Sequence, residues 1–137
     1  MSGATADKRP AASGPGARAK FPRERRLLRH SDFERVYKTG RRHFAQGMTV
    51  FYRLRSEGRG LRVGFAAGKA IGGAVQRNRM KRRLREAVRL HWPQIDAPVD
   101  IVINPKKSLL TIDLADLGGE ISRAFEVVRK SVEKRNQ

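Results

Sequence analysis

Residues 72–89 read GGAVQRNRMKRRLREAVR and combine a dense positive charge with apolar residues at helical spacing. At about 100° per residue, one arc of such a helix holds Met80, Leu84, Ala87 and Val88. The neighbouring arc holds only polar and basic residues, namely Asn78, Lys81, Arg82, Arg85 and Arg89. The pattern predicts a helix that buries one face in the protein core and presents the adjacent basic arc to a partner.

This stretch contains a single acidic residue, Glu86. A solvated helix face normally mixes charges of both signs, because like charges four positions apart repel. We therefore interpret the basic arc as a binding surface for a polyanion such as a nucleic acid. A solubilising surface with no partner is the alternative.

The composition indicates one small domain whose positive charge is concentrated in its middle. The 137 residues have 39% apolar content and a formal net charge of +18. Residues 21–91 hold twenty basic and five acidic residues, whereas residues 92–137 hold seven of each. Because the excess lies within the folded part, a defined phosphate-binding surface is favoured over a diffuse tail. We predict a disordered basic extension over 1–20, a single RNA-binding domain over 21–134 and a tail over 135–137.

The sequence also bears on where the protein acts. It has no cysteine, which fits a reducing compartment and excludes disulfides and thiolate metal sites. No apolar run approaches the length of a transmembrane helix, and residues 1–20 lack the apolar core of a signal peptide. We therefore expect a cytoplasmic protein with no membrane partner. A transit peptide is the minor alternative, because residues 1–20 are basic and poor in acids.

Two further helices are expected. Ser31 and Glu34 form a capping box that opens a short helix, and Gly40 ends that helix as a left-handed cap. A long C-terminal helix is expected from about Asp113, because apolar residues recur there at helical spacing.

Strands are expected over 48–55 and 61–67, which are rich in β-forming residues and are joined as a hairpin through a glycine-containing turn. A glycine-rich bend over 68–73 leads into the basic helix. Residues 99–103 are apolar on both faces except for Asp100, as in a central strand. The order helix, two or three strands, helix, strand, helix predicts an α+β fold, a small two-layer sandwich with helices packed on a sheet.

The residue types suggest no catalytic or metal site. His30, His43 and His91 are the only histidines, and none shows metal-ligand spacing. Metal-free nuclease chemistry usually needs two positioned histidines or a histidine–carboxylate pair. Residues 64–70 superficially match a phosphate-binding loop, but the glycines are one residue too close and Ala70 replaces the magnesium-binding Ser or Thr. We therefore predict no catalytic residue and no metal site in the protein itself.

The segment 71–86 resembles the Arg-Asn-Arg signature of the bacterial ribonuclease P protein family, with Arg77, Asn78 and Arg79 at its centre. The resemblance covers about residues 21–130. The family's opening helix and the strands before and after the signature are similar to segments 26–40, 61–64 and 100–103.

The resemblance implies an accessory role in a ribonucleoprotein. In that family the RNA subunit is the catalyst: it uses magnesium ions to cleave the 5′ leader from precursor tRNA, and the protein binds no cofactor of its own. The implied partners are therefore the catalytic RNA subunit and precursor tRNA, with no DNA. The holoenzyme is an endoribonuclease that produces mature tRNA 5′ ends. A left-handed β-α-β crossover is also implied, against the general preference for right-handed ones.

The resemblance assigns two sets of binding residues. The basic helix and the bend bind the RNA subunit through Lys69, Gly72, Gly73, Arg77, Asn78, Arg79, Lys81, Arg82, Arg85 and Arg89. A cleft between the first helix and the sheet holds the single-stranded leader through Phe33, Tyr37 and Tyr52, whose flat faces can stack on unpaired bases. On spacing alone, Phe33 and Tyr37 fit a packed core, and the resemblance favours the leader site for Tyr37 and Tyr52.

Two positions depart from the family pattern. Gly68-Lys69-Ala70 stands where the family usually has Ser-Lys-Lys, so only Lys69 carries over. Gly73 stands where Asn is common, although a glycine still lets a phosphate approach the helix N-terminus closely.

Two other functions stay open. A ribosomal or RNA-chaperone protein would bind RNA through the same basic arc but would lack an aromatic-lined cleft for a leader. A self-sufficient nuclease would need an acid–base or metal cluster.

Overall fold

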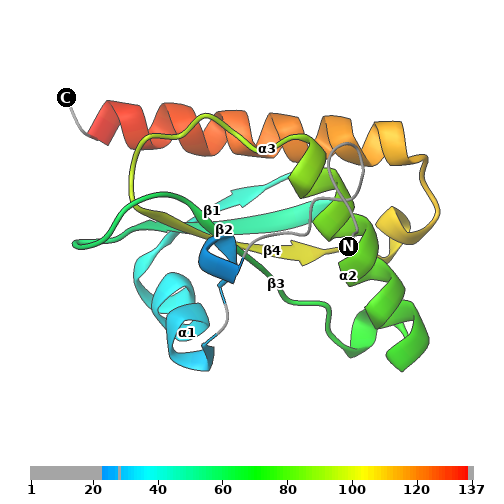
Figure 1. The fold of residues 1–137 in the computed structure, drawn as a ribbon. Coiled ribbons are helices and arrows are strands. Elements are labelled where there is room, and N and C mark those ends of the chain that lie inside the picture. The colour runs from blue at the N-terminus through cyan, green and yellow to red at the C-terminus, as the bar shows by residue number, and fades with distance from the viewer. Residues whose placement is uncertain (1–22, 28, 136–137) are drawn as a thin grey trace, which may run out of the picture.

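The structure, a computed structural model, describes residues 23–27 and 29–135 and consists of a four-stranded sheet and three α-helices (Figure 1). The strands are β1 (Arg41–Phe44), β2 (Met48–Leu54), β3 (Arg62–Phe65) and β4 (Val99–Pro105). The helices are α1 (His30–Thr39), α2 (Ala74–Leu90) and α3 (Leu114–Arg135), with 3-10 turns η2 (Arg23–Arg25), η3 (Lys69–Ile71) and η4 (Lys107–Leu110). This confirms the α+β class. The predicted extension over 1–20 lies outside the described residues.

The strand order β1-β2-β4-β3 corrects the predicted hairpin between β2 and β3. β4 lies between them, antiparallel to β2 and parallel to β3. The hairpin forms instead between β1 and β2, where the Ala45 N–H donates to the Met48 carbonyl at 2.9 Å. β4 takes a central place because residues 99–103 are buried on both faces. The glycine-containing turn is therefore a loop that joins β2 to β3 past the end of β4.

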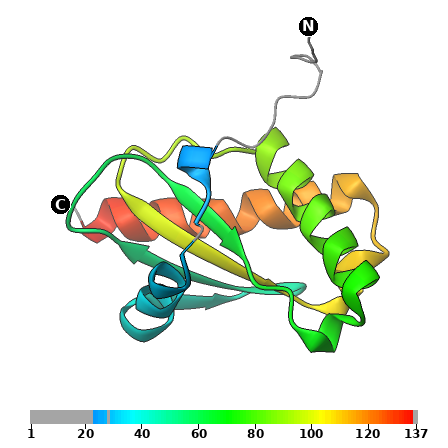
Figure 2. The same ribbon diagram turned by 60° about the horizontal axis from the view of Figure 1, so that its bottom comes forward.

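α2 and α3 cover one face of the sheet and enclose the main hydrophobic core (Figure 2). α2 buries Met80, Leu84, Ala87 and Val88, the four residues of its predicted apolar arc. α2 also joins the parallel strands β3 and β4, which gives the β-α-β crossover that the resemblance implies; its left hand stays a prediction. Within the described residues, no helix combines the length and the apolar character needed to cross a membrane.

α1 lies on the opposite face of the sheet and adds a partial layer to the sandwich. Val36 of α1 is fully buried in a second, smaller core with Leu27 and Val102. The Phe33 ring approaches β3 closely at Gly64, where a Cβ would lie 2.6 Å from Phe33 Cζ. The missing side chain at Gly64 therefore sets how closely α1 packs on the sheet.

Both ends of α1 differ from the predicted signals. The helix begins at His30, one residue before Ser31, and its N-cap Arg29 makes no side-chain capping hydrogen bond, so the capping box does not form. Gly40 does end the helix, but with φ −87° rather than in the left-handed region. A glycine is needed there because a Cβ would lie 2.5 Å from the carbonyl oxygens of Val36 and Tyr52.

Candidate nucleic-acid interface

The basic arc of α2, Asn78, Lys81, Arg82, Arg85 and Arg89, lies beside the buried face of the helix, as the periodicity predicts. Asn78, Arg82 and Arg85 are exposed, whereas Lys81 and Arg89 are half-buried. Among the described residues, only Arg89 of this arc forms an ion pair, with Glu86 Oε2 at 2.6 Å from its Nη2. The other charges of the arc lack an acidic partner in this part of the chain, which suits contact with phosphates.

The glycine-rich bend extends this surface to the start of α2. Gly72 adopts φ 138°, which favours glycine, and so redirects the chain from η3 into the helix. Gly73 is the N-cap and has no side chain to cover the first-turn N–H groups, which leaves them accessible to an anion. Beside the bend, Lys69 and Arg79 are exposed and Arg77 is half-buried. The structure thus brings the predicted RNA-subunit residues together on α2 and the bend that precedes it.

Arg83 lies outside the basic arc and holds the fold together. Its Nε donates to the Leu109 carbonyl at 3.2 Å, and its Nη2 donates to the Ile112 carbonyl. These contacts fasten the segment between β4 and α3 to α2. Helical periodicity separates Arg83 from the arc, but it cannot reveal partners that lie 26 and 29 residues further along the chain.

Exposed aromatic side chains gather on the α1 face of the sheet, where Tyr37, Phe44 and Phe51 form what we call the aromatic platform. Tyr37 and Phe44 are 39% and 69% exposed, and Phe51 is half-buried. The Tyr37 and Phe51 rings meet edge to face, with centroids 4.8 Å apart. The Tyr37 hydroxyl donates to Asn104 Oδ1 at 3.1 Å. Burial raises the pKa of Tyr37, with a smaller opposite effect from this hydrogen bond, so the hydroxyl stays a donor at neutral pH.

Arg42 of β1 brings a positive charge to the aromatic platform. Its guanidinium carbon lies 5.4 Å from the Phe44 ring centroid and 5.9 Å from that of Phe51, within the range of a cation–π interaction. Arg42, Phe44 and Phe51 were not predicted from the sequence. They converge only through the β1–β2 hairpin, in which Arg42 lies opposite Phe51 and Phe44 opposite Thr49. Predicting this cluster would have required the pairing register of β1 with β2, which the sequence does not reveal.

The structure corrects the prediction that Tyr52 lies in one cleft with Phe33 and Tyr37. Tyr52 is 6% exposed within the main core, and its hydroxyl donates to Ser131 Oγ of α3 at 3.1 Å. Because successive strand residues point to opposite faces, its neighbour Phe51 occupies the α1 face instead. Phe33 is half-buried against the smaller core on the α1 face. Tyr37 alone of the three predicted residues is part of the exposed platform.

The histidines lie on three different elements. His30 Nε2 is 3.8 Å from Glu34 Oε2, beyond hydrogen-bond distance, and both side chains are exposed. His43 lies in β1, and His91 Nδ1 is 3.1 Å from Ser122 Oγ, which links the end of α2 to α3. Within the described residues, no group of three or more His, Cys, Asp or Glu side chains could hold a metal ion.

A small α+β domain with an arginine-rich helix arc and a separate exposed aromatic platform has the features of an RNA-binding protein. The family model described as Ribonuclease P matches residues 21–129. The ribonuclease P protein component of Symbiobacterium thermophilum is 40% identical over 101 residues, which cover 74% of this chain and 88% of that protein. The chain therefore belongs to the ribonuclease P protein family, whose place is in a tRNA-processing ribonucleoprotein with an RNA partner.

Solved structures agree with this assignment. The RNase P protein of Staphylococcus aureus has a TM-score of 0.67 and 25% sequence identity, covering 77% of this chain and 95% of that one. A second structure of the Staphylococcus aureus protein, with a TM-score of 0.68 and 25% identity over 77% of this chain and 88% of that one, is described as a mutant with defective mRNA degradation activity.

Proposed function

We propose that this protein binds the catalytic RNA subunit of ribonuclease P through the basic arc and bend of α2, and binds the single-stranded 5′ leader of precursor tRNA on the α1 face. The RNA subunit, with its magnesium ions, supplies the cleavage that produces mature tRNA 5′ ends. The observation that carries the proposal is the presence of two chemically different surfaces, one on α2 and the bend before it and the other on the α1 face of the sheet. One is rich in exposed arginine, and the other is aromatic.

The basic arc suits a folded RNA. Its exposed arginines offer planar donor groups that match phosphate oxygens in pairs, and the uncovered first-turn N–H groups of α2 add backbone donors. Because α2 is fastened to the core by Met80 and Leu84, both 0% exposed, these donors are held on a rigid element.

The aromatic platform suits an unpaired strand. Stacking on aromatic side chains accepts any base, which fits a leader whose sequence varies between precursor tRNAs. Arg42 lies beside the platform and can contact the strand's phosphates. A ribosomal or RNA-chaperone protein would use the basic arc, but it is expected to lack an aromatic-lined cleft for a leader, which the 69% exposure of Phe44 beside Tyr37 and Phe51 does not favour.

A self-sufficient ribonuclease is the second candidate, because a mutant of the similar Staphylococcus aureus protein is described as having defective mRNA degradation activity. The positions of the histidines do not favour this function. His30 and Glu34 form the one histidine–carboxylate contact among the described residues, and it is long and exposed. Such a pair lacks the second group that would orient it for proton transfer.

Reconstitution tests the proposal. Purified protein is mixed with a bacterial ribonuclease P RNA and precursor tRNA at low magnesium, and mature 5′ ends are measured. We expect the protein to raise cleavage strongly in the presence of the RNA subunit and to yield no product without it. Cleavage by the protein without the RNA subunit would contradict the proposal and favour a self-sufficient ribonuclease. Binding of RNA without any rise in cleavage would favour the RNA-chaperone function.

A further inference from the structure

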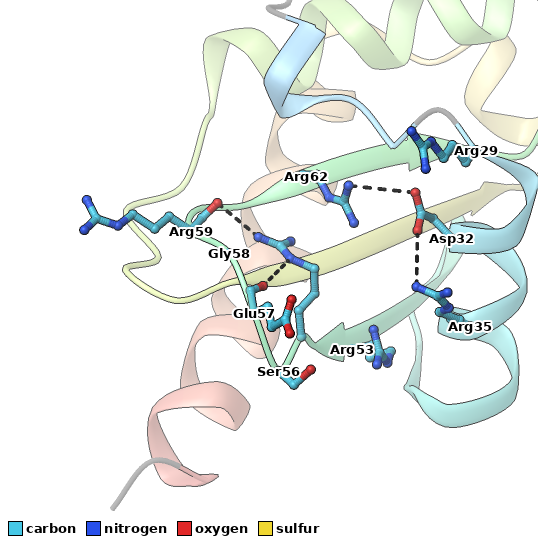
Figure 3. A pocket seen from close by; sticks show the side chains of 10 residues that line it. Arg29, Asp32, Arg35, Arg53, Ser56, Glu57, Gly58, Arg59 and Arg62 are labelled. Carbon is cyan, nitrogen blue, oxygen red and sulfur yellow. Dashed lines mark hydrogen bonds and ion pairs between the residues drawn. The ribbon is translucent and has the colours of Figure 1, made fainter.

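A second feature of the α1 face is an arginine-lined pocket beside the first turns of α1 (Figure 3). It has a volume of about 630 Å³ and lies between α1 and the loop from β2 to β3. The residues that line it are Arg29, Asp32, Arg35, Arg53, Arg55, Ser56, Glu57, Gly58, Arg59 and Arg62. We call it the arginine pocket.

Two of these arginines are committed to the fold. Asp100, 2% exposed, accepts hydrogen bonds from Arg55 Nη1 at 2.6 Å and from Arg62 Nε and Nη2 at 2.8 Å each. Arg55 also donates to the carbonyl oxygens of Glu57, Arg59 and Gly60, so the loop is folded around its guanidinium. The pocket therefore has a rigid wall that forms before any ligand arrives.

The remaining arginines leave the pocket strongly positive. Six arginines line it against three carboxylates, those of Asp32, Glu57 and the buried Asp100. Figure 3 shows the Arg59 guanidinium pointing away from the pocket, so five guanidinium groups contribute their charge there. Within the described residues, Arg29 and Arg53 have no carboxylate partner, and Arg35 is 3.9 Å from Asp32 with 65% of its side chain exposed. Figure 3 shows Arg53 between the loop and Arg35 of α1. Like charges gathered in a cleft raise the local potential for an anion, and arginine suits phosphate in particular.

We infer that the arginine pocket binds a backbone phosphate of the single-stranded 5′ leader, an inference that rests on the proposed function. Arg29 precedes Tyr37 by eight positions, which places them about 12 Å apart along α1. An extended strand of a few nucleotides can therefore stack on the aromatic platform and place a phosphate in the pocket. The protein would then hold the leader at two points, by base stacking at one and by charge at the other.

The test compares leader lengths in the reconstituted complex. The double variant Arg29→Gln with Arg53→Gln removes two charges that point into the pocket, and neither side chain carries an ion pair among the described residues. Arg41→Gln is the matched control: it removes an exposed arginine of β1, and its pairing opposite Tyr52 places it on the other face of the sheet. Binding constants are measured for mature tRNA and for precursors with leaders of increasing length, together with the affinity of the protein for the RNA subunit.

We expect the double variant to bind long-leader precursors about tenfold more weakly or worse, with a smaller salt dependence. Its affinity for short-leader precursors, mature tRNA and the RNA subunit should be unchanged, as should its thermal unfolding. An equal loss of affinity for all tRNAs, or a loss of affinity for the RNA subunit, would indicate that the arginine pocket contacts a phosphate of the RNA subunit. Either result would overturn the inference. So would a double variant that matches Arg41→Gln at every leader length. If the affinity of the parent complex for precursor tRNA does not change with leader length, the protein does not bind the leader. That result would overturn the proposed function as well as the inference about the arginine pocket.

Discussion

The Phe33 ring lies directly over Gly64, so that a Cβ on Gly64 would be 2.6 Å from Phe33 Cζ and 2.9 Å from Leu27 Cβ. This contact joins α1 to the edge strand β3 and fixes the distance between the helix and the sheet. The aromatic platform and the arginine pocket both depend on that distance, because each takes residues from α1 and from the sheet.

Gly64→Ala is therefore expected to destabilise the protein by about 1–3 kcal/mol, the usual range for overpacking. Phe33 must shift for the added methyl to fit, and part of the obstruction is the Leu27 Cβ, which cannot rotate away. Chemical denaturation measures the effect. Gly68→Ala is the control, since a Cβ there meets nothing within 4 Å. Equal stability of the two variants would show that α1 is not packed as described.

The basic arc is tested by charge removal. Arg82→Ala and Arg85→Ala should each weaken RNA-subunit binding by about 1–3 kcal/mol and lower the salt slope by about one ion. Both side chains are exposed, so thermal unfolding should hardly change. Binding titrations at several salt concentrations measure both quantities.

Arg83→Ala offers a matched comparison on the same helix. It removes the donor to the Leu109 and Ile112 carbonyls, so it should lower stability by about 1–3 kcal/mol and affect RNA affinity less. If all three arginine variants lose RNA affinity equally, the assignment of faces on α2 is wrong.

The buried carboxylate of Asp100 is expected to matter for stability. Asp100→Ala leaves Arg55 and Arg62 without their acceptor and should cost about 3 kcal/mol, the low end for buried ion pairs because Arg62 is partly exposed. Glu57→Ala, in the neighbouring loop, should change stability by less than about 0.5 kcal/mol. Denaturant titrations of both variants distinguish a structural Asp100 from a dispensable one.

The histidines should be dispensable for cleavage. Replacing His30, His43 and His91 together by Asn should leave the activity of the reconstituted complex within about tenfold. Folding must be checked, because His91 contacts Ser122. A loss of about a thousandfold with folding and RNA binding intact would match general acid–base catalysis and would contradict a non-catalytic protein.

Local periodicity predicted the parts of the fold that depend on neighbouring residues. The apolar arc of α2 is confirmed at all four positions, and residues 99–103 form a central strand, because an apolar face or run must be buried somewhere. The pairing of strands is a long-range property, and the turn at Gly58 gave no sign that β4 would enter between β2 and β3.

The candidate site shows the same limit. Val50, Phe51 and Tyr52 are consecutive and apolar or aromatic, so alternation in β2 does not decide which of them faces α1. The structure decides it, with Tyr52 against Ser131 and Phe51 against Tyr37. The arginines of the pocket likewise come from α1, β2, β3 and a loop, and no sequence spacing links them.

Whether this protein holds the 5′ leader can be measured by comparing the binding of precursor and mature tRNA to a reconstituted complex that carries Tyr37→Ala. Stacking is worth about 1–3 kcal/mol per base, and it exists only for a substrate with an unpaired 5′ extension. Tyr37→Ala should therefore weaken precursor binding by about that amount and leave mature tRNA affinity unchanged, and a leader of one or two nucleotides should abolish the difference from the parent. Equal loss of affinity for precursor and mature tRNA, in a variant that remains folded, would contradict the account.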